Sequence, residues 1–287
     1  MNKFLVVMFL FFSYQTVNAA PIYVEHDWLT NRLDDKNIVL VDMTADGVQY
    51  LRYHIPGAVR LSYQDIVVKR KDKVSVRVPD ARLYKVLASL GITRDKHIVI
   101  YDDMGGLEAG RLFWELERIG HPAVSVLRGG LVKWVLAGHP VDNKPVKPIA
   151  AQYEAGKPKR NNEAVLDNIR NNASSLLLDV RSMDEYVGHP RYPRSGHIPG
   201  AKWWPWEANV DFANGFVPRS DDVLQSELTK LGVKDKTKPL ILYCRSGHRA
   251  SQSYLTLRSL GYTDVKLYDG SMAEYASKRE LPLQKAK

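Results

Sequence analysis

The sequence contains two halves that carry the same short motifs in the same order. The pentapeptide HIPGA occurs twice, first from His54 and again from His197. An apolar run that ends in aspartate precedes each copy, and a second apolar run and a glycine-containing turn follow it; the aspartates are Asp42 and Asp179, the second runs are residues 98–101 and 240–243, and the turns are residues 127–130 and 267–270. Because the repeating unit is as long as a domain, the pattern predicts two duplicated domains rather than a solenoid of short repeats.

Each half alternates short apolar runs with amphipathic segments, which is the pattern of an α/β fold. Residues 98–101 and 240–243 are predicted to be buried parallel strands, because they are short and apolar throughout. Residues 81–90 and 250–260 are predicted to be helices. We therefore expect two α/β domains, each a parallel sheet covered by helices on both faces. In such folds ligands bind beyond the carboxyl ends of the strands.

The first 19 residues have the features of a secretory signal peptide. Lys3 supplies a positive charge, residues 4–12 are apolar, and small residues lead to Ala19, after which we expect cleavage. No later stretch is long and apolar enough to predict a membrane span. The sequence therefore predicts a periplasmic or secreted protein.

A segment rich in proline and lysine separates the two halves. It contains Pro140, Pro145, Pro148 and Pro158 and shows no apolar periodicity. Such a segment is typical of an extended linker on the surface. We accordingly assign residues 20–140 to the first domain, residues 141–162 to the linker and residues 163–287 to the second domain.

The single cysteine of the chain, Cys244, lies directly after the predicted strand at residues 240–243. An unpaired thiol cannot belong to an internal disulfide, and exported proteins usually carry cysteines in pairs. The thiolate is the reactive form of cysteine, and nearby cations and helix N-termini favour it. The sequence therefore predicts that Cys244 is a nucleophile at the end of a buried strand.

The residues that follow Cys244 predict a site for an anion. A turn from a strand into a helix exposes successive backbone N–H groups at the positive end of the helix dipole. Gly247 can adopt the positive φ that a tight loop needs, and Arg245 and Arg249 add positive charge. The predicted substrate-binding residues are Arg245, Ser246, Gly247, His248 and Arg249.

Residues 244–249 read Cys-Arg-x-Gly-x-Arg, and together with the repeated HIPGA motifs they make the chain resemble the tandem-domain rhodaneses, a family of thiosulfate sulfurtransferases. The resemblance implies a catalytic second domain and an inactive first domain. It also implies that Cys244 takes a sulfur atom from an anionic donor such as thiosulfate, forms a persulfide and passes the sulfur to a thiophilic acceptor. In this family the pair that corresponds to Asp179 and Arg181 braces the active loop.

The chain departs from the family pattern at two positions. Asp102 stands in the first half where Cys244 stands in the second, and a carboxylate cannot form a persulfide. Glu185 lies about where thiosulfate-using members often have a second substrate-binding arginine, which weakens the assignment of thiosulfate as donor. Arg191 and Arg194 lie in a stretch that the first half lacks, and either is a candidate replacement for that arginine.

The composition excludes several other classes of function. Lys and Arg number 41 against 32 Asp and Glu, and the sequence pI of 9.4 favours small anionic substrates. The basic residues are dispersed and form no nucleic-acid-binding motif, so no nucleic-acid partner is expected. The histidines show no metal-ligand spacing and no glycine-rich nucleotide motif occurs, so we expect neither a metal nor a cofactor.

The residues around Cys244 bear on three alternatives to a thiosulfate sulfurtransferase. A phosphatase-like enzyme on the same fold has five residues between cysteine and arginine, but four separate Cys244 from Arg249. A mercaptopyruvate sulfurtransferase typically has glycine after the cysteine, where this chain has Arg245. A sulfur carrier or persulfide-binding module for a partner protein needs the same loop, so that alternative stays open.

Overall fold

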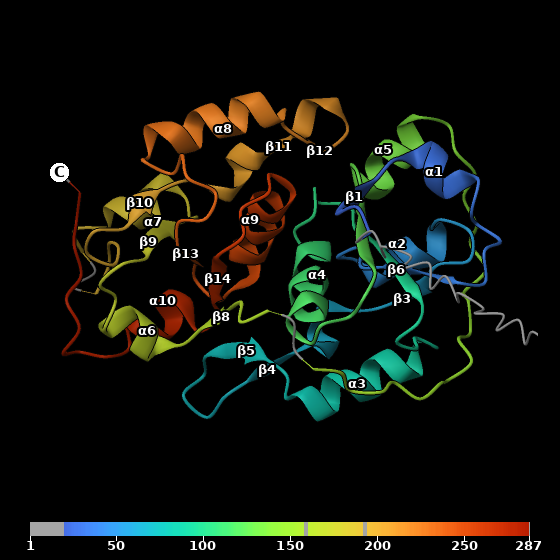
Figure 1. Ribbon diagram of the computed structural model, residues 1–287, viewed down its shortest axis with the longest axis horizontal. Helices are drawn as coiled ribbons and strands as arrows, with labels where there is room; N and C mark the ends of the chain where they lie inside the picture. The colour runs from blue at the N-terminus through green and yellow to red at the C-terminus, as the bar shows by residue number, and fades with distance from the viewer. Residues whose placement is uncertain (1–19, 158–159, 192–193, 287) are drawn as a thin grey trace, which may run out of the picture.

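The computed structural model describes residues 20–157, 160–191 and 194–286, and it contains two domains side by side (Figure 1). The segment predicted to be a signal peptide, residues 1–19, lies outside the described residues. Each domain has a five-stranded sheet in which every pairing is parallel. The predicted α/β fold class is confirmed.

The first domain has the strand order β1-β7-β6-β2-β3. Its sheet strands are β1 (Tyr23–Val24), β2 (Ile38–Asp42), β3 (Val59–Arg60), β6 (His97–Tyr101) and β7 (Val124–Leu127). Its helices are α1 (His26–Thr30), α2 (Gly47–Arg52), α3 (Asp80–Ser89), α4 (Ala109–Arg118) and α5 (Gly130–Leu136), with a 3-10 turn, η1, at Tyr63–Asp65.

The second domain repeats this order as β8-β14-β13-β9-β10. Its sheet strands are β8 (Glu163–Ala164), β9 (Leu176–Asp179), β10 (Lys202–Trp203), β13 (Leu240–Tyr243) and β14 (Val265–Tyr268). Its helices are α6 (Leu166–Arg170), α7 (Met183–Val187), α8 (Asp221–Lys230), α9 (His248–Ser259) and α10 (Ser271–Tyr275); two 3-10 turns, η2 (Trp206–Asn209) and η3 (Phe212–Asn214), and a small hairpin, β11 (Val210–Asp211) and β12 (Val217–Pro218), complete it.

The two HIPGA motifs occupy equivalent places and hold them by the same contacts. His54 stacks on Tyr50 with the ring centroids 4.0 Å apart, and its Nδ1 lies 2.7 Å from the Tyr50 carbonyl oxygen. His197 stacks on Tyr186 at 3.8 Å, and its Nδ1 lies 2.8 Å from the Tyr186 carbonyl oxygen. Both histidines are buried, so these contacts give His197 the same structural role as His54.

The domains meet along helices α4 and α9, which face each other at the centre of the molecule (Figure 1). Gly110 allows this close approach, because a Cβ there would lie 2.8 Å from the carbonyl oxygen of Ser251. Further along the interface the Tyr254 hydroxyl donates a hydrogen bond to Glu117, and the guanidinium of Arg258 pairs with the same carboxylate. The result is a tight interface between the two domains.

A hairpin of the first domain also reaches the second domain. It consists of β4 (Val67–Lys69) and β5 (Ser75–Arg77), and it extends beneath α6 and β8 in Figure 1. Arg70 pairs with Glu274 of α10, and Arg77 pairs with Glu163 of β8 at 2.9 Å. The hairpin thus anchors the first domain to β8, which pairs with β14, and to α10, which follows β14 in the chain.

The connection between the domains is extended, and several of its residues bond to the domains. Residues 137–162, apart from the two positions 158–159 that are not described, contain no helix or strand beyond a bridge between Asp142 and His54. Tyr153 is buried, with its hydroxyl 2.9 Å from Nδ1 of His121. Asn162 is buried between the domains, where its side chain donates to the Tyr254 hydroxyl and the Trp114 carbonyl.

The contact between His121 and the connecting segment predicts a pH-dependent stability. Nε2 of His121 lies 2.9 Å from the Lys96 carbonyl, so Nε2 donates and Nδ1 accepts from Tyr153, which requires a neutral ring. Burial lowers the pKa of His121 to about 4. Because the unfolded chain then binds the proton more readily, this group reduces stability as the pH falls through the range below its unfolded pKa.

We expect His121 to remove about 2 kcal/mol from the free energy of unfolding between about pH 7 and about pH 5. Denaturant unfolding of the wild-type protein and of His121→Phe at both pH values measures this contribution. The variant should lose less stability on acidification than the wild type. An equal loss in both proteins would contradict the assignment.

Candidate active site

Cys244 lies immediately after strand β13, and a loop of residues 245–247 leads from it into helix α9. The cysteine is 1% exposed. Gly247 has a φ of 79°, which favours glycine, and a Cβ there would also collide with the carboxylate of Asp269. The predicted nucleophile and its predicted binding loop are therefore contiguous at the carboxyl end of the sheet.

The start of helix α10 holds this loop in place. The Ser271 hydroxyl accepts hydrogen bonds from the N–H groups of Cys244 and Gly247, both at 3.1 Å, and donates to the Tyr268 carbonyl at 2.7 Å. The N–H of Met272 binds the Cys244 carbonyl at 3.0 Å. Sequence reasoning missed Ser271, which directly follows the second glycine turn at residues 267–270.

Other N–H groups of the loop are without partners in the described parts of the chain. Those of Arg245, Ser246, His248 and Arg249 make no hydrogen bond to a described residue. His248 and Arg249 lie in the first turn of α9, where backbone N–H groups have no partner within the helix. A set of free donors at a helix N-terminus is a site for an anion.

The corresponding loop of the first domain already holds an anionic group of its own. The carboxylate of Asp102 follows β6 as Cys244 follows β13, and it accepts four backbone hydrogen bonds of 2.8–3.1 Å. The donors are the N–H groups of Met104, Gly106, Glu108 and Ala109. Burial raises the pKa of Asp102, and these donors oppose that rise. By analogy, the open N–H donors of the second domain are suited to bind a negatively charged group.

The side chain of Arg249 is less available than the sequence suggested. Its guanidinium pairs with Glu185 through two hydrogen bonds of 2.6 and 3.0 Å. From the sequence, Glu185 was identified as standing where other family members often have a substrate-binding arginine. In the structure its carboxylate also neutralises the charge of Arg249. Arg249 therefore offers the loop its backbone N–H rather than a free charge.

The pair expected to brace the loop braces another segment. Arg181 binds Asp179 through both carboxylate oxygens and donates to the Gly196 carbonyl at 2.8 Å, but among the described residues neither side chain bonds to residues 245–249. Trp203 adds a hydrogen bond from its indole N–H to the Arg181 carbonyl. In the structure, Ser271 rather than this pair makes the hydrogen bonds to the loop around Cys244.

The two candidate replacements for the missing arginine differ. Arg194 donates to the carbonyls of Ala276, Lys278 and Leu281, so it holds the chain that follows α10. Arg191 is exposed. Within the described residues neither guanidinium bonds to the Cys244 loop, so the structure gives neither the role of the absent arginine.

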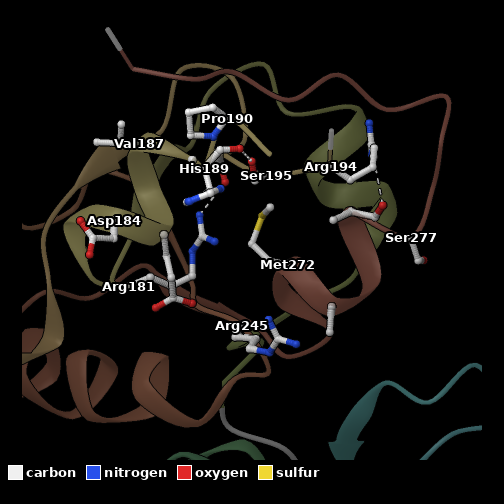
Figure 2. A pocket seen from close by; sticks show the side chains of 15 residues that line it. Arg181, Asp184, Val187, His189, Pro190, Arg194, Ser195, Arg245, Met272 and Ser277 are labelled. Carbon is white, nitrogen blue, oxygen red and sulfur yellow. Dashed lines mark hydrogen bonds between the residues drawn. The ribbon is translucent and has the colours of Figure 1, made fainter. Parts of the chain in front are cut away.

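A large cavity adjoins the loop on the side of helices α7 and α10. It has a volume of about 770 Å³, and Arg181, Glu185, Arg194, Arg245 and Met272 are among its lining residues, but Cys244 is not. Figure 2 shows the side chains of Arg181 and Met272 directed into the cavity, with Arg245 at its edge. Arg245 is exposed and pairs with no acidic side chain in the described part of the chain, so it is an available cation beside the loop.

A smaller cleft lies between the two domains. It has a volume of about 190 Å³, and its lining includes Ser62, Tyr63 and Glu108 of the first domain and His248 of the loop. Burial raises the pKa of Tyr63 well above its usual range, and the negative charge of Cys244 adds to the rise. The first domain therefore forms part of the surroundings of the nucleophile.

A buried ion pair joins the domains behind the loop. The guanidinium of Arg111 is fully buried and binds both carboxylate oxygens of Asp269, at 2.5 and 3.1 Å. The same carboxylate accepts the backbone N–H of Arg77 and lies against Gly247. Burial opposes the charge on Arg111, but Asp269 outweighs it and raises the pKa of Arg111. The Arg111–Asp269 pair therefore joins the two domains and also supports the loop that follows Cys244.

Among the described residues, no group of three or more His, Cys, Asp or Glu side chains is arranged to hold a metal ion. No helix in the same ranges has the length and apolar character that a membrane crossing requires.

Comparison with known proteins places both halves in one family. The model of the rhodanese-like domain matches residues 25–137 and 161–278. A Thermus thermophilus protein named sulfur carrier protein TtuD is 32% identical over 284 residues, covering 92% of this chain and 96% of that protein. The thiosulfate sulfurtransferase of Azotobacter vinelandii is 29% identical over 270 residues, covering 93% and 98%.

Solved structures share the fold at lower identity. The anaerobic ergothioneine biosynthesis enzyme from Chlorobium limicola, in complex with trimethyl histidine, has a TM-score of 0.82 at 23% identity, covering 93% of this chain and 70% of that one. YnjE has a TM-score of 0.79 at 22% identity, covering 93% and 68%. These likenesses concern the arrangement of the chain.

The role of Ser271 predicts a loss of stability when its hydroxyl is removed. Ser271→Ala leaves the N–H groups of Cys244 and Gly247 buried without an acceptor, so we expect the free energy of unfolding to fall by about 2–3 kcal/mol. Denaturant unfolding measures the loss, and the rate at which a thiol-specific reagent modifies Cys244 should rise because the loop is released.

Ser259→Ala is the matched control, because the Ser259 hydroxyl also donates to a carbonyl three residues earlier but accepts nothing from the loop. If the two variants lose the same stability and leave the thiol equally protected, Ser271 does not hold the loop.

Proposed function

The chain belongs to the rhodanese family, whose chemistry is sulfur transfer, and we propose that it moves a sulfane sulfur from thiosulfate or a similar anionic donor to a thiophilic acceptor through a persulfide on Cys244. The proposed binding residues are Arg245, Ser246, Gly247, His248 and Arg249. The donor and the acceptor are small molecules in this proposal, and neither a metal nor an organic cofactor takes part.

The observation that carries the proposal is the contrast between the two strand-end loops. In the first domain the backbone donors converge on the carboxylate of Asp102. In the second domain the residue at that place is Cys244, and the donors that follow it have no partner among the described residues. A thiolate or persulfide supplies the missing negative charge, and preorganised donors of this kind stabilise charge that develops during a reaction.

The first half of the reaction loads the cysteine. The Cys244 thiolate attacks the outer sulfur of thiosulfate, the sulfur–sulfur bond of the donor breaks, and its electron pair leaves with sulfite. The free N–H groups of the loop hold the resulting persulfide, and Arg245 attracts the donor and the departing anion. In the second half an acceptor attacks the outer sulfur of the persulfide, and Cys244 returns to its thiolate form.

A sulfur carrier is the second candidate. The relative named sulfur carrier protein TtuD supports it, since this chain is 32% identical to that protein. A carrier needs the same loop and the same persulfide, but it delivers its sulfur to a protein partner instead of turning over with a small acceptor. Steady-state turnover with thiosulfate and cyanide separates the two, because an enzyme cycles and a carrier stops after one sulfur.

Export is part of the proposal. The signal-peptide features of residues 1–19 predict removal after Ala19 and a periplasmic or secreted mature protein. N-terminal sequencing of the protein recovered from a secreting host tests this. A mature chain that still begins at Met1 and stays inside the cell would contradict it.

The persulfide itself is the first prediction of this mechanism. Intact mass of the mature protein should increase by roughly 32 Da after thiosulfate is added and return to its starting value after cyanide is added. Cys244→Ser should show no increase and should fold normally, because its side chain differs by one atom in the core. A gain of mass in Cys244→Ser would move the chemistry away from this residue.

The pairing of Glu185 with Arg249 predicts that the donor site is weaker than it could be. Glu185→Gln removes a negative charge and frees the Arg249 guanidinium, so we expect the KM for thiosulfate to fall about threefold to tenfold while kcat changes little. Steady-state kinetics at low ionic strength measure both constants.

Glu280→Gln is the matched control, because Glu280 also pairs with an arginine, Arg170 of α6, but this pair is exposed. A raised KM in Glu185→Gln would show instead that the ion pair shapes the site.

A further inference from the structure

His248 and Glu108 form a contact that the proposed mechanism does not use. Nε2 of His248 lies 3.0 Å from Oε2 of Glu108, so an imidazole of the catalytic loop faces a carboxylate of the other domain. Both atoms are buried, and apart from this close approach neither has a hydrogen-bond partner among the described residues. The carboxylate therefore faces one ring nitrogen of His248.

The remaining nitrogen of His248 is available to a ligand. Nδ1 makes no hydrogen bond to any residue that the structure describes, and the side chain keeps 27% of its surface exposed. A carboxylate at Nε2 places the ring proton on Nε2 and leaves the lone pair on Nδ1. A neutral imidazole oriented in this way is a base for a substrate proton.

The position of Glu108 is itself determined by the first domain's closed loop. The backbone N–H of Glu108 donates to Asp102 at 2.8 Å, and α4 begins at the next residue, Ala109. Its side chain is 10% exposed, so the carboxylate is fixed at the domain boundary. The loop of the first domain, which has no nucleophile, thus places the carboxylate of Glu108 against the loop that follows Cys244.

The ring of Tyr63 fixes the other face of the histidine. The Tyr63 and His248 ring centroids are 4.3 Å apart with an angle of 40° between the planes. Both residues and Glu108 line the cleft between the domains. His248 lies four residues after Cys244, so the cleft and the histidine adjoin the loop that carries the nucleophile.

We propose that His248, oriented by Glu108 across the domain interface, is the base that deprotonates the sulfur acceptor, and that the acceptor is an organic thiol. The inference rests on the persulfide cycle proposed above. An acceptor thiol passes its proton to Nδ1 of His248, and its thiolate attacks the outer sulfur of the persulfide. The sulfur–sulfur bond breaks, its electron pair returns to Cys244, and the acceptor leaves as a persulfide. His248 then releases the proton to water.

The chemistry of the acceptor supports a base at this place. Most alkyl thiols are protonated near neutral pH and must lose a proton before they attack, whereas a thiol that is already ionised can attack without this step. A base is therefore useful for a thiol of high pKa and useless for one that is already ionised. Arg249 is paired with Glu185, and neither Arg249 nor Arg245 can accept a proton, so His248 is the loop residue whose side chain can act as a base.

The test compares acceptors of different acidity on the loaded enzyme. The full-length mature protein is loaded at Cys244 with thiosulfate, or with inorganic polysulfide if thiosulfate does not load it. The rate of persulfide discharge is then followed with a series of alkyl and aryl thiols at one pH near neutrality. Wild type, His248→Gln and Glu108→Gln are compared, with His139→Gln and Glu25→Gln as controls for substitution elsewhere in the first domain.

We expect His248→Gln to slow discharge by alkyl thiols about 10²-fold while leaving discharge by ionised aryl thiols within about twofold of wild type. Glu108→Gln should show the same selectivity with a smaller loss, and adding imidazole to His248→Gln should restore part of the alkyl rate. The extent of persulfide loading in each variant reports whether the loop is intact. The two controls should match the wild type.

An equal loss with every thiol would overturn the inference, because it would assign His248 a role in the shape of the loop. Unchanged discharge would overturn it as well. If neither donor loads Cys244, the persulfide cycle fails and this inference fails with it; normal loading with unselective discharge removes this inference alone.

Discussion

The structure depends on a requirement that its two strand-end loops share: backbone N–H groups that converge at the start of a helix need a negative charge. The first domain meets this requirement internally through Asp102, which accepts four such hydrogen bonds. The second domain replaces that carboxylate by Cys244 and leaves its donors open. This difference, together with the shorter loop after Cys244, separates a loop whose donors are satisfied internally from one whose donors are open to a ligand.

The open loop is supported from behind by the other domain. Arg111 and Asp269 are buried together, and Asp269 lies against Gly247 while Ser271, two residues on, holds the N–H groups of Cys244 and Gly247. Removing one partner of a buried ion pair leaves an uncompensated charge, so such a pair ties its two sides together strongly. The first domain is inactive as a nucleophile, yet it fixes the segment on which the nucleophile's loop rests.

Much of the fold could be predicted because its signals are local. The HIPGA motifs, the apolar runs and the position of Cys244 after a strand are each visible within a few residues, and the fold class followed from them. The pairing of Glu185 with Arg249, the contact of Glu108 with His248 and the ion pairs of the hairpin at residues 67–77 with the second domain could not be predicted in this way, because each joins side chains that are distant in sequence. Ser271 was missed for a similar reason: its hydroxyl matters only once β14 has brought it beneath the loop.

The unfilled donors around Cys244 have a thermodynamic consequence. An anion that binds them in the folded chain, and has no site in the unfolded chain, stabilises the fold by mass action in proportion to its affinity. A covalently attached sulfur anion acts on the same donors without being diluted into solution. The free energy of unfolding of the second domain therefore depends on whether Cys244 carries a persulfide. The protein is least stable when Cys244 carries no sulfur and the loop has bound no anion.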